Sequence, residues 1–198
     1  MRQLVVHGHE APTDPDFALD DLASGAGRLD LLAQSLVSGL LVSHDIREDA
    51  RVVLVLADEL RLTFDGAALR SLHPDERSAA ALVRSALEER DRAVGRQAVE
   101  PAPGIWLERA GFERTVRDLG SDGTVLPLVP DGTPAVDVDP PADPVFVLSD
   151  HRPFTDAERA LLAEIGDEAV SLGPRALHTD QAITVAHNWL DNEGWSRW

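Results

Sequence analysis

Residues 144–191 carry the pattern that decides the fold: PVFVLSDH at 144–151, FTDAERALLAEIGDEAVSLGP at 154–174 and RALHTDQAITVAHNWLD at 175–191. Two short apolar runs, at 145–148 and 169–172, indicate strands, and each is followed by a polar loop and a helical pattern. The first run ends in Ser149-Asp150-His151 and the second in Gly173-Pro174. Ligands in open α/β sheets bind outside the carboxyl ends of strands, so these two strand ends are the first candidates for a small-molecule site.

The rest of the chain alternates strand and helix patterns in the same way. Apolar runs predict strands at 2–7, 52–57, 60–64, 105–107 and 125–129, the last of them an edge strand or a bulged one because it contains Pro127. Leucines at positions 29, 32, 36 and 40 share one helix face. Residues 94–104 are expected to form an exposed excursion and 134–144 a loop. This alternation predicts an α/β protein with a mainly parallel sheet.

Helix start signals support the same assignment. Pro74, Asp75 and Glu76 favour a helix start, and a short helix is expected at 111–120. Thr155 and Glu158 form a capping box that begins the next helix. The last helix presents one common face formed by residues 183, 186, 187 and 190.

Length and composition narrow the class of protein. A chain of 198 residues indicates one domain, 1–198. It has no cysteine, which excludes disulfides, thiol ligands and a cysteine nucleophile. Its apolar runs fall far short of the roughly 18 residues of a membrane span, and the N-terminus lacks a signal-peptide pattern. We therefore expect a soluble cytoplasmic protein with no membrane partner.

The protein is strongly acidic. The formal net charge is -17, the sequence pI is about 4.6, and all 18 basic residues are arginines. An acidic, lysine-free composition is typical of halophiles, whose cytoplasm is filled with salt, although a high-GC genome could also produce it. At 1 M salt the Debye length is only about 3 Å. Net acidity therefore does not exclude an RNA partner, but RNA binding would depend on close contacts.

Common catalytic and cofactor motifs are weak in this sequence. The glycine-containing stretch at 24–27 lacks a lysine and a preceding strand, so it is a poor phosphate loop. His7 and His9 could form a metal pair, but ordinary polar loop histidines are the preferred interpretation, and no metal is expected. The aspartates at positions 20, 21, 30 and 45 could be read as a carboxylate cluster. In a chain with 35 acidic residues, the simplest interpretation is that they are solvated surface residues.

Three arginines lie near predicted helix ends in polar blocks: Arg28 in GRLD, Arg47 in SHDIR and Arg77 in PDER. Guanidinium groups are the usual readers of phosphate. The alternative is ion pairing with the aspartates at 30, 45 and 75, and composition alone favours these ion pairs.

These blocks together resemble a known family. DFALDDL, GAGRLDLL, LVSHDIR, LHPDERSAAALVRSALE, VFVLSDH and VSLGPRALHTDQAITVAHN, in this order, resemble the archaeal TrmY family of the SPOUT superfamily, from about residue 1 to 192. Members of that family are tRNA (pseudouridine-54 N1)-methyltransferases. The resemblance implies an α/β SPOUT fold with a C-terminal trefoil knot at approximately 125–192, a homodimer, a tRNA partner and S-adenosylmethionine as the methyl donor.

The resemblance also implies site residues. Asp21 matches an acidic position implicated in the reaction, and Arg28, Asp45, Arg47 and Arg77 would hold the RNA. The implied cofactor residues are Leu128, Gly132, Ser149, Ser171, Leu172, Gly173, Pro174, Leu177 and Ala182.

Two positions depart from the family pattern. Ala182 stands where members usually carry cysteine, and Ser149 where many carry glycine. Three alternatives remain open: the same methylation on another RNA such as rRNA, a non-catalytic knotted dimer that binds S-adenosylmethionine or RNA, and an α/β domain for another adenine-containing ligand.

Overall fold

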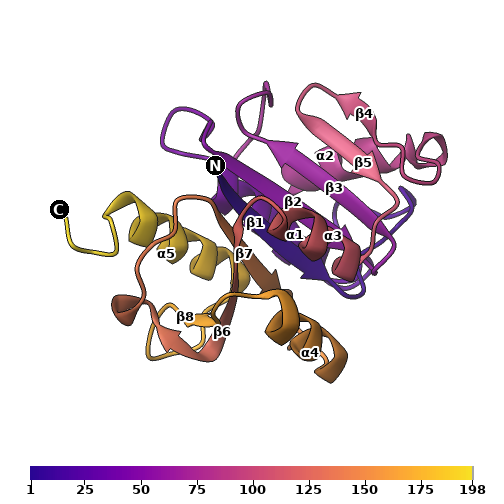
Figure 1. Ribbon diagram of the computed structural model, residues 1–198. Helices are drawn as coiled ribbons and strands as arrows, with labels where there is room; N and C mark the ends of the chain where they lie inside the picture. The colour runs from indigo at the N-terminus through magenta and orange to yellow at the C-terminus, as the bar shows by residue number, and fades with distance from the viewer. Residues whose placement is uncertain (198) are drawn as a thin grey trace.

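The computed structural model describes residues 1–197 (Figure 1). Trp198, the last residue of the predicted domain, lies outside the described residues. The elements in chain order are β1 (Arg2–Gly8), α1 (Leu29–Leu40), β2 (Ala50–Leu56), β3 (Leu60–Asp65), α2 (Glu76–Leu87), η1 (Arg90–Arg92), β4 (Val99–Ala102), β5 (Ile105–Glu108), α3 (Phe112–Gly120), β6 (Thr124–Pro134), η2 (Ala135–Asp137), β7 (Pro144–Ser149), α4 (Asp156–Ile165), β8 (Val170–Ser171) and α5 (Thr179–Asp191).

The strands form one sheet in the order β4-β5-β3-β2-β1-β7-β6-β8. The pairs from β2 through β1, β7 and β6 to β8 are parallel, whereas β3, β5 and β4 continue the sheet antiparallel. The prediction of an α/β protein with a mainly parallel sheet is confirmed. Because the parallel strands run the same way, their carboxyl ends meet at one edge of the sheet, and residues that follow them gather there.

Alternating side chains divide the core into two layers. Leu4 and Val6 point to the face covered by α1, α2 and α5, while Val5 and Val53 point to the face covered by α3 and α4 (Figure 1). The four leucines predicted to share one face of α1 are all fully buried. Burying a leucine side chain stabilises a fold by about 1.5–3 kcal/mol, so this face accounts for the position of α1 on the sheet.

Two sequence predictions change in the structure. The exposed excursion expected at 94–104 is wrong, because β4 pairs with β5 there and buries Val99. The missed signal is Gly104, whose positive φ of 80° forms the tight turn between the two strands. The second change concerns Pro127: β6 lies between β7 and β8, so the strand is not an edge, and it carries an irregularity between Leu128 and Thr133. Pro127 itself pairs in register with Val147 of β7, and the irregularity follows it.

Candidate functional site

A cavity opens at the carboxyl ends of β6 and β8, beside the first turn of α5. Its lining includes six residues of the predicted cofactor set: Leu128, Ser171, Leu172, Gly173, Leu177 and Ala182. Most of these side chains are apolar, and Ser171 donates a hydrogen bond to the Gly173 carbonyl at 3.1 Å. Such a lining suits the flat adenine ring and the carbon chain of an adenosyl-methionine group. The residues present therefore fit that cofactor chemically.

The cavity is narrow. Its free volume is about 50 Å³, against roughly 300–1,000 Å³ for typical small-molecule pockets. Residues 174–178 between β8 and α5 are exposed and border this cavity. A ligand of adenosyl-methionine size is larger than the free volume.

The remaining three predicted cofactor residues lie around this cavity without forming its lining. Pro174 is exposed on the loop that follows β8. Gly132 lies so close to the backbone of residues 169–170 that a Cβ would come within 2.7 Å of it, so only glycine fits without a shift. The Ser149 carbonyl accepts a hydrogen bond from Thr179 Oγ1 at 2.7 Å, which ties the end of β7 to the start of α5.

Asp21 and Arg28 lie on the loop of residues 9–28, which follows β1 at the same edge of the sheet. Asp21 is exposed and accepts a hydrogen bond from the Ser24 backbone N–H at 3.3 Å. Arg28 takes a left-handed backbone conformation at the start of α1 and donates two 3.0 Å hydrogen bonds to Asp30. These hydrogen bonds raise the pKa of Arg28, with a smaller contribution from Asp150. Arg28 thus lies close to the carboxyl end of β7.

Asp45 and Arg47 lie at the opposite edge of the sheet. They follow the end of α1 and precede β2, so they neighbour the amino ends of the strands. Arg47 donates hydrogen bonds of 2.9 and 3.1 Å to Asp191 at the far end of α5. The 13-residue α5 starts beside Ser149, and at 1.5 Å per residue it spans about 20 Å. One protomer therefore does not bring Arg47 to Asp21 and Arg28.

Of the three ion pairs that the sequence suggested, only the one between Arg28 and Asp30 is present among the residues that the structure describes. Arg28 pairs with Asp30 as the sequence indicates, but Arg47 pairs with Asp191 instead of Asp45. Asp75 caps α2 by accepting the Ser78 N–H at 2.8 Å. Arg77, in the first turn of that helix, is exposed and makes no salt bridge within residues 1–197.

His187 is the residue at this second edge that sequence reasoning left without a role. It is buried between α5 and α1, and its Nε2–H donates to the Gly39 carbonyl at 3.0 Å. Because a carbonyl only accepts, Nδ1 carries the lone pair and accepts from Arg2 at 3.2 Å. Burial, reinforced by the Arg47 and Arg2 charges, lowers the pKa of His187 to about 4. Burial opposes ionisation of Asp191, but hydrogen bonds from Arg47 and Arg2 outweigh it and lower that pKa.

Comparison with solved structures identifies the class of fold. The crystal structure titled "Archaeoglobus Fulgidus Nep1 bound to S-adenosylhomocysteine" superposes with a TM-score of 0.62, covering 98% of each chain at 16% sequence identity. At this identity the likeness shows the fold alone.

Sequence comparison identifies the family. Residues 1–195 match the family model described as "Putative SAM-dependent RNA methyltransferase", and the chain belongs to this family. The relatives include proteins named tRNA (pseudouridine(54)-N(1))-methyltransferase from Haloarcula marismortui, 59% identical over 198 residues, and from Haloferax volcanii, 57% identical over 198 residues. Both alignments cover 100% of each chain. The resemblance to the TrmY family is confirmed.

Proposed function

We propose that this protein transfers a methyl group from S-adenosylmethionine to N1 of pseudouridine 54 in the T-loop of tRNA, giving N1-methylpseudouridine. The observation that carries the proposal is the full-length identity of 59% with a relative that bears this activity in its name. The fold agrees, because its candidate cofactor cavity and its Asp21 loop lie at the same edge of the sheet.

The cofactor would lie in the cavity between β6, β8 and α5. When bound, its sulfonium makes the methyl group electrophilic. The protein's own contribution is to position the base for in-line attack and to exclude water, since alignment can supply much of the rate. Leu128, Leu172 and Leu177 would enclose the adenosyl group. The small side chain of Ala182 does not narrow the cofactor cavity. It supplies no thiol group, and positioning of the base does not require a thiol.

Asp21 is the proposed proton acceptor for N1. Its carboxylate is exposed at the edge where the cofactor cavity opens, so an extruded nucleobase can reach it. The Ser24 N–H fixes one carboxylate oxygen, which leaves the other free to accept a proton. Arg28, also at this edge, would contact the flanking phosphates or the base.

The reaction is tested by incubating the purified protein with tRNA whose pseudouridine 54 lacks the N1 methyl group. We expect nucleoside mass spectrometry to detect N1-methylpseudouridine at position 54 with wild-type protein. Asp21→Asn should lower kcat at least tenfold while binding of S-adenosylmethionine is kept. Asp20→Asn, the adjacent exposed carboxylate, is the matched control and should retain activity. Full activity of Asp21→Asn would show that Asp21 is not the proton acceptor. Methylated product in rRNA instead of tRNA would show that rRNA is the substrate.

We extend the proposal to a homodimer. Asp45 and Arg47 are about 20 Å from the cofactor edge of their own protomer, too far to contact a base held beside Asp21, and in the proposed dimer a second copy brings them to that base. Arg77 belongs to the same side, because the neighbouring Pro74 lines a cleft with Arg47 and His187.

Mixed protomers test this arrangement. Asp21→Ala and Arg47→Ala variants, each inactive alone, should regain about a quarter of wild-type activity when refolded together in equal amounts, because about half of the dimers are heterodimers and each of these has one intact site. Mixing each variant with itself provides the control. No recovery, with heterodimers present by native mass spectrometry, would show that both residues serve one protomer's site.

The proposal includes one domain over residues 1–198, with a trefoil knot at approximately 125–192. What supports the knot is that β8 lies outside β6, while α5 starts beside Ser149 and packs Trp189 against Phe146 of β7. The chain thus returns from beyond β6 to β7, which agrees with a knot in this region. A crystal structure whose backbone reduces to an unknotted line would contradict it.

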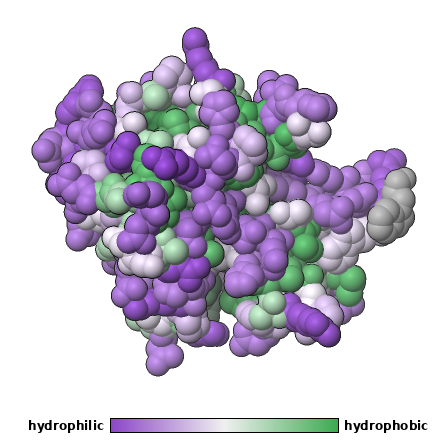
Figure 2. Space-filling view, turned by 180° about the vertical axis from the view of Figure 1, so that it is seen from behind, coloured by the Kyte–Doolittle hydropathy of each residue, from purple (hydrophilic) through white to green (hydrophobic). Residues whose placement is uncertain are grey.

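The cellular setting is proposed on composition. None of the helices in residues 1–197 is long and apolar enough to cross a membrane. Hydrophilic side chains cover most of the face drawn in Figure 2. With a net charge of -17 and no lysine, we propose a halophilic cytoplasmic enzyme, whose activity should rise with KCl up to molar concentrations.

A further inference from the structure

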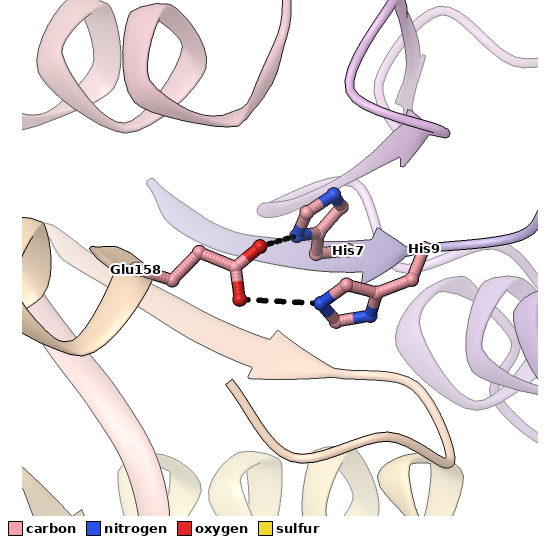
Figure 3. A group of neighbouring side chains, drawn as sticks. All are labelled: His7, His9 and Glu158. Atoms are coloured by element: carbon pink, nitrogen blue, oxygen red, sulfur yellow. Dashed lines mark hydrogen bonds and ion pairs between the residues drawn. The ribbon is translucent and has the colours of Figure 1, made fainter. Parts of the chain in front are cut away.

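Two histidines and a glutamate converge on the α3/α4 face of the sheet, away from the cofactor cavity. His7 is the penultimate residue of β1, His9 directly follows the strand, and Glu158 lies in the first turn of α4 (Figure 3). One ligand atom from each residue can be chosen so that all lie within 4.8 Å of one another. His7 is 2% exposed, so it is a buried strand residue and not the polar loop histidine that the sequence favoured.

Two of the distances are close to those of a metal site. Glu158 directs one carboxylate oxygen to His7 Nδ1 at 3.2 Å and the other to His9 Nε2 at 3.2 Å. An ion with ligands at about 2.0–2.2 Å holds tetrahedral ligand atoms about 3.3–3.6 Å apart. The three ligand atoms lie within 4.8 Å of one another, so a bound ion would draw them closer together, and Figure 3 shows both rings turned toward the carboxylate.

His7 supplies an independent observation. Within residues 1–197 neither of its ring nitrogens has a hydrogen-bond partner, although the ring is buried. Nδ1 is close to Glu158, but its direction does not suit an N–H donor. A buried polar atom without a partner destabilises the folded state. A lone pair on Nδ1 that binds a cation would remove this cost.

His9 is oriented as metal-binding histidines usually are. Its Nδ1 lies 3.0 Å from Oδ1 of Asp150, whose side chain is 0% exposed. A carboxylate on one ring nitrogen fixes the tautomer and leaves the other nitrogen free to bind a metal. In addition, Phe112 stacks on His7 with ring centroids 4.7 Å apart, which fixes the orientation of the buried ring.

We propose that His7, His9 and Glu158 bind one divalent transition-metal ion, and that Zn²⁺ fits best. Two imidazoles and a carboxylate suit zinc, whereas Mg²⁺ and Ca²⁺ prefer oxygen ligands alone. A cavity of about 280 Å³ that also borders Asp58 adjoins the three residues and leaves room for a water as a fourth ligand. The ion would fasten α4 to β1 and to the Asp150 loop, which begins directly after Ser149.

Zinc titration of the full chain tests the site. Untagged protein is stripped with chelator and dialysed into metal-free molar KCl. Calorimetric titration should give one Zn²⁺ per chain, and Co²⁺ should produce the visible absorption of a low-coordinate nitrogen–oxygen site. At a free Zn²⁺ concentration 100 times the Kd, the Tm should rise by about 5–10 °C.

Matched variants assign the ligands. Glu158→Gln removes the anionic ligand while glutamine can still complete the capping box of α4. It and His9→Gln should each weaken Zn²⁺ binding at least tenfold, and Asp150→Asn should weaken it about 10–100-fold. His73→Gln, at an exposed histidine outside the cluster, should bind as wild type does. Equal Zn²⁺ affinity and equal Co²⁺ spectra for wild type and Glu158→Gln would overturn the proposed metal site. The cluster would then be His9 bridging the carboxylates of Asp150 and Glu158.

Discussion

Acidification should loosen the contact between α5 and α1 through His187. Its Nε2–H bonds the Gly39 carbonyl, and its Nδ1 faces the Arg2 guanidinium. A second proton can only go to Nδ1, where it would point at a positive charge in a buried place. Burial and these charges set the folded-state pKa near 4, whereas a histidine in the unfolded chain titrates near 6.5.

The sign follows from linkage. The unfolded chain binds this proton more readily than the folded protein, so the stabilisation is complete above pH 6.5 and is lost as the pH falls from 6.5 toward 4. At pH 5 the loss relative to pH 8 is about 2 kcal/mol, with a limit of about 3.4 kcal/mol below pH 4. These values exceed the effect of most exposed groups and are large against a total stability of about 5–15 kcal/mol.

Urea unfolding at constant KCl, followed by tryptophan fluorescence between pH 8 and pH 5, measures this loss. His187→Gln should be less stable at pH 8, because it disturbs two buried hydrogen bonds worth about 0.5–1.5 kcal/mol each. Its stability should nevertheless fall with pH by about 2 kcal/mol less than that of wild type. Replacing exposed His73 should leave the wild-type slope unchanged. Parallel wild-type and His187→Gln curves would refute the assignment.

Three further predictions concern the loops, the core and the charge. Gly27→Ala places a Cβ on the Glu10 carbonyl at a positive φ, so it should cost clearly more than the about 1–2 kcal/mol of Gly95→Ala, whose positive φ has open space around it; equal urea midpoints would contradict this. Trp189→Ala should cost about 3–5 kcal/mol, and Trp189→Phe much less because the buried Nε1 lacks a hydrogen-bond partner within residues 1–197; equal losses would show that the indole N–H contributes and would contradict this. The Tm should rise by several degrees between 0.1 and 2 M KCl as the repulsion of a -17 charge is screened, and a flat Tm in calorimetry would argue against salt adaptation.

Much of the fold was predictable because local patterns agree with the final packing. The leucine face of α1 and the capping box of α4 are both present. The β4 strand was not predictable in the same way. Four residues containing a proline give almost no periodicity, and only the left-handed turn at Gly104 brings Val99 against Leu107.

The candidate site was predictable only in part. Which residues follow strands can be read from the sequence, and this places Ser149 and Ser171 at one edge of the sheet. Long-range partners cannot be read in this way. Asp191 is far from Arg47 in the chain, and Glu158 reaches His7 and His9 only because β7 pairs with β1. Spacing in the chain therefore pointed to the His7 and His9 pair alone, and gave no signal for Glu158 or Asp191.

The geometry of α1 gives dimerisation a role in the proposed chemistry. The 12-residue helix begins directly after Arg28, next to the carboxyl ends of the strands, and returns the chain to their amino ends before Arg47. Its length of about 18 Å keeps the two arginines apart, although they are near in sequence. If both serve one RNA site, two copies must meet, and each brings a net charge of -17. At 1 M salt the Debye length of about 3 Å removes most of that repulsion. Dimerisation and folding should therefore strengthen together as KCl rises, because one screened charge opposes both.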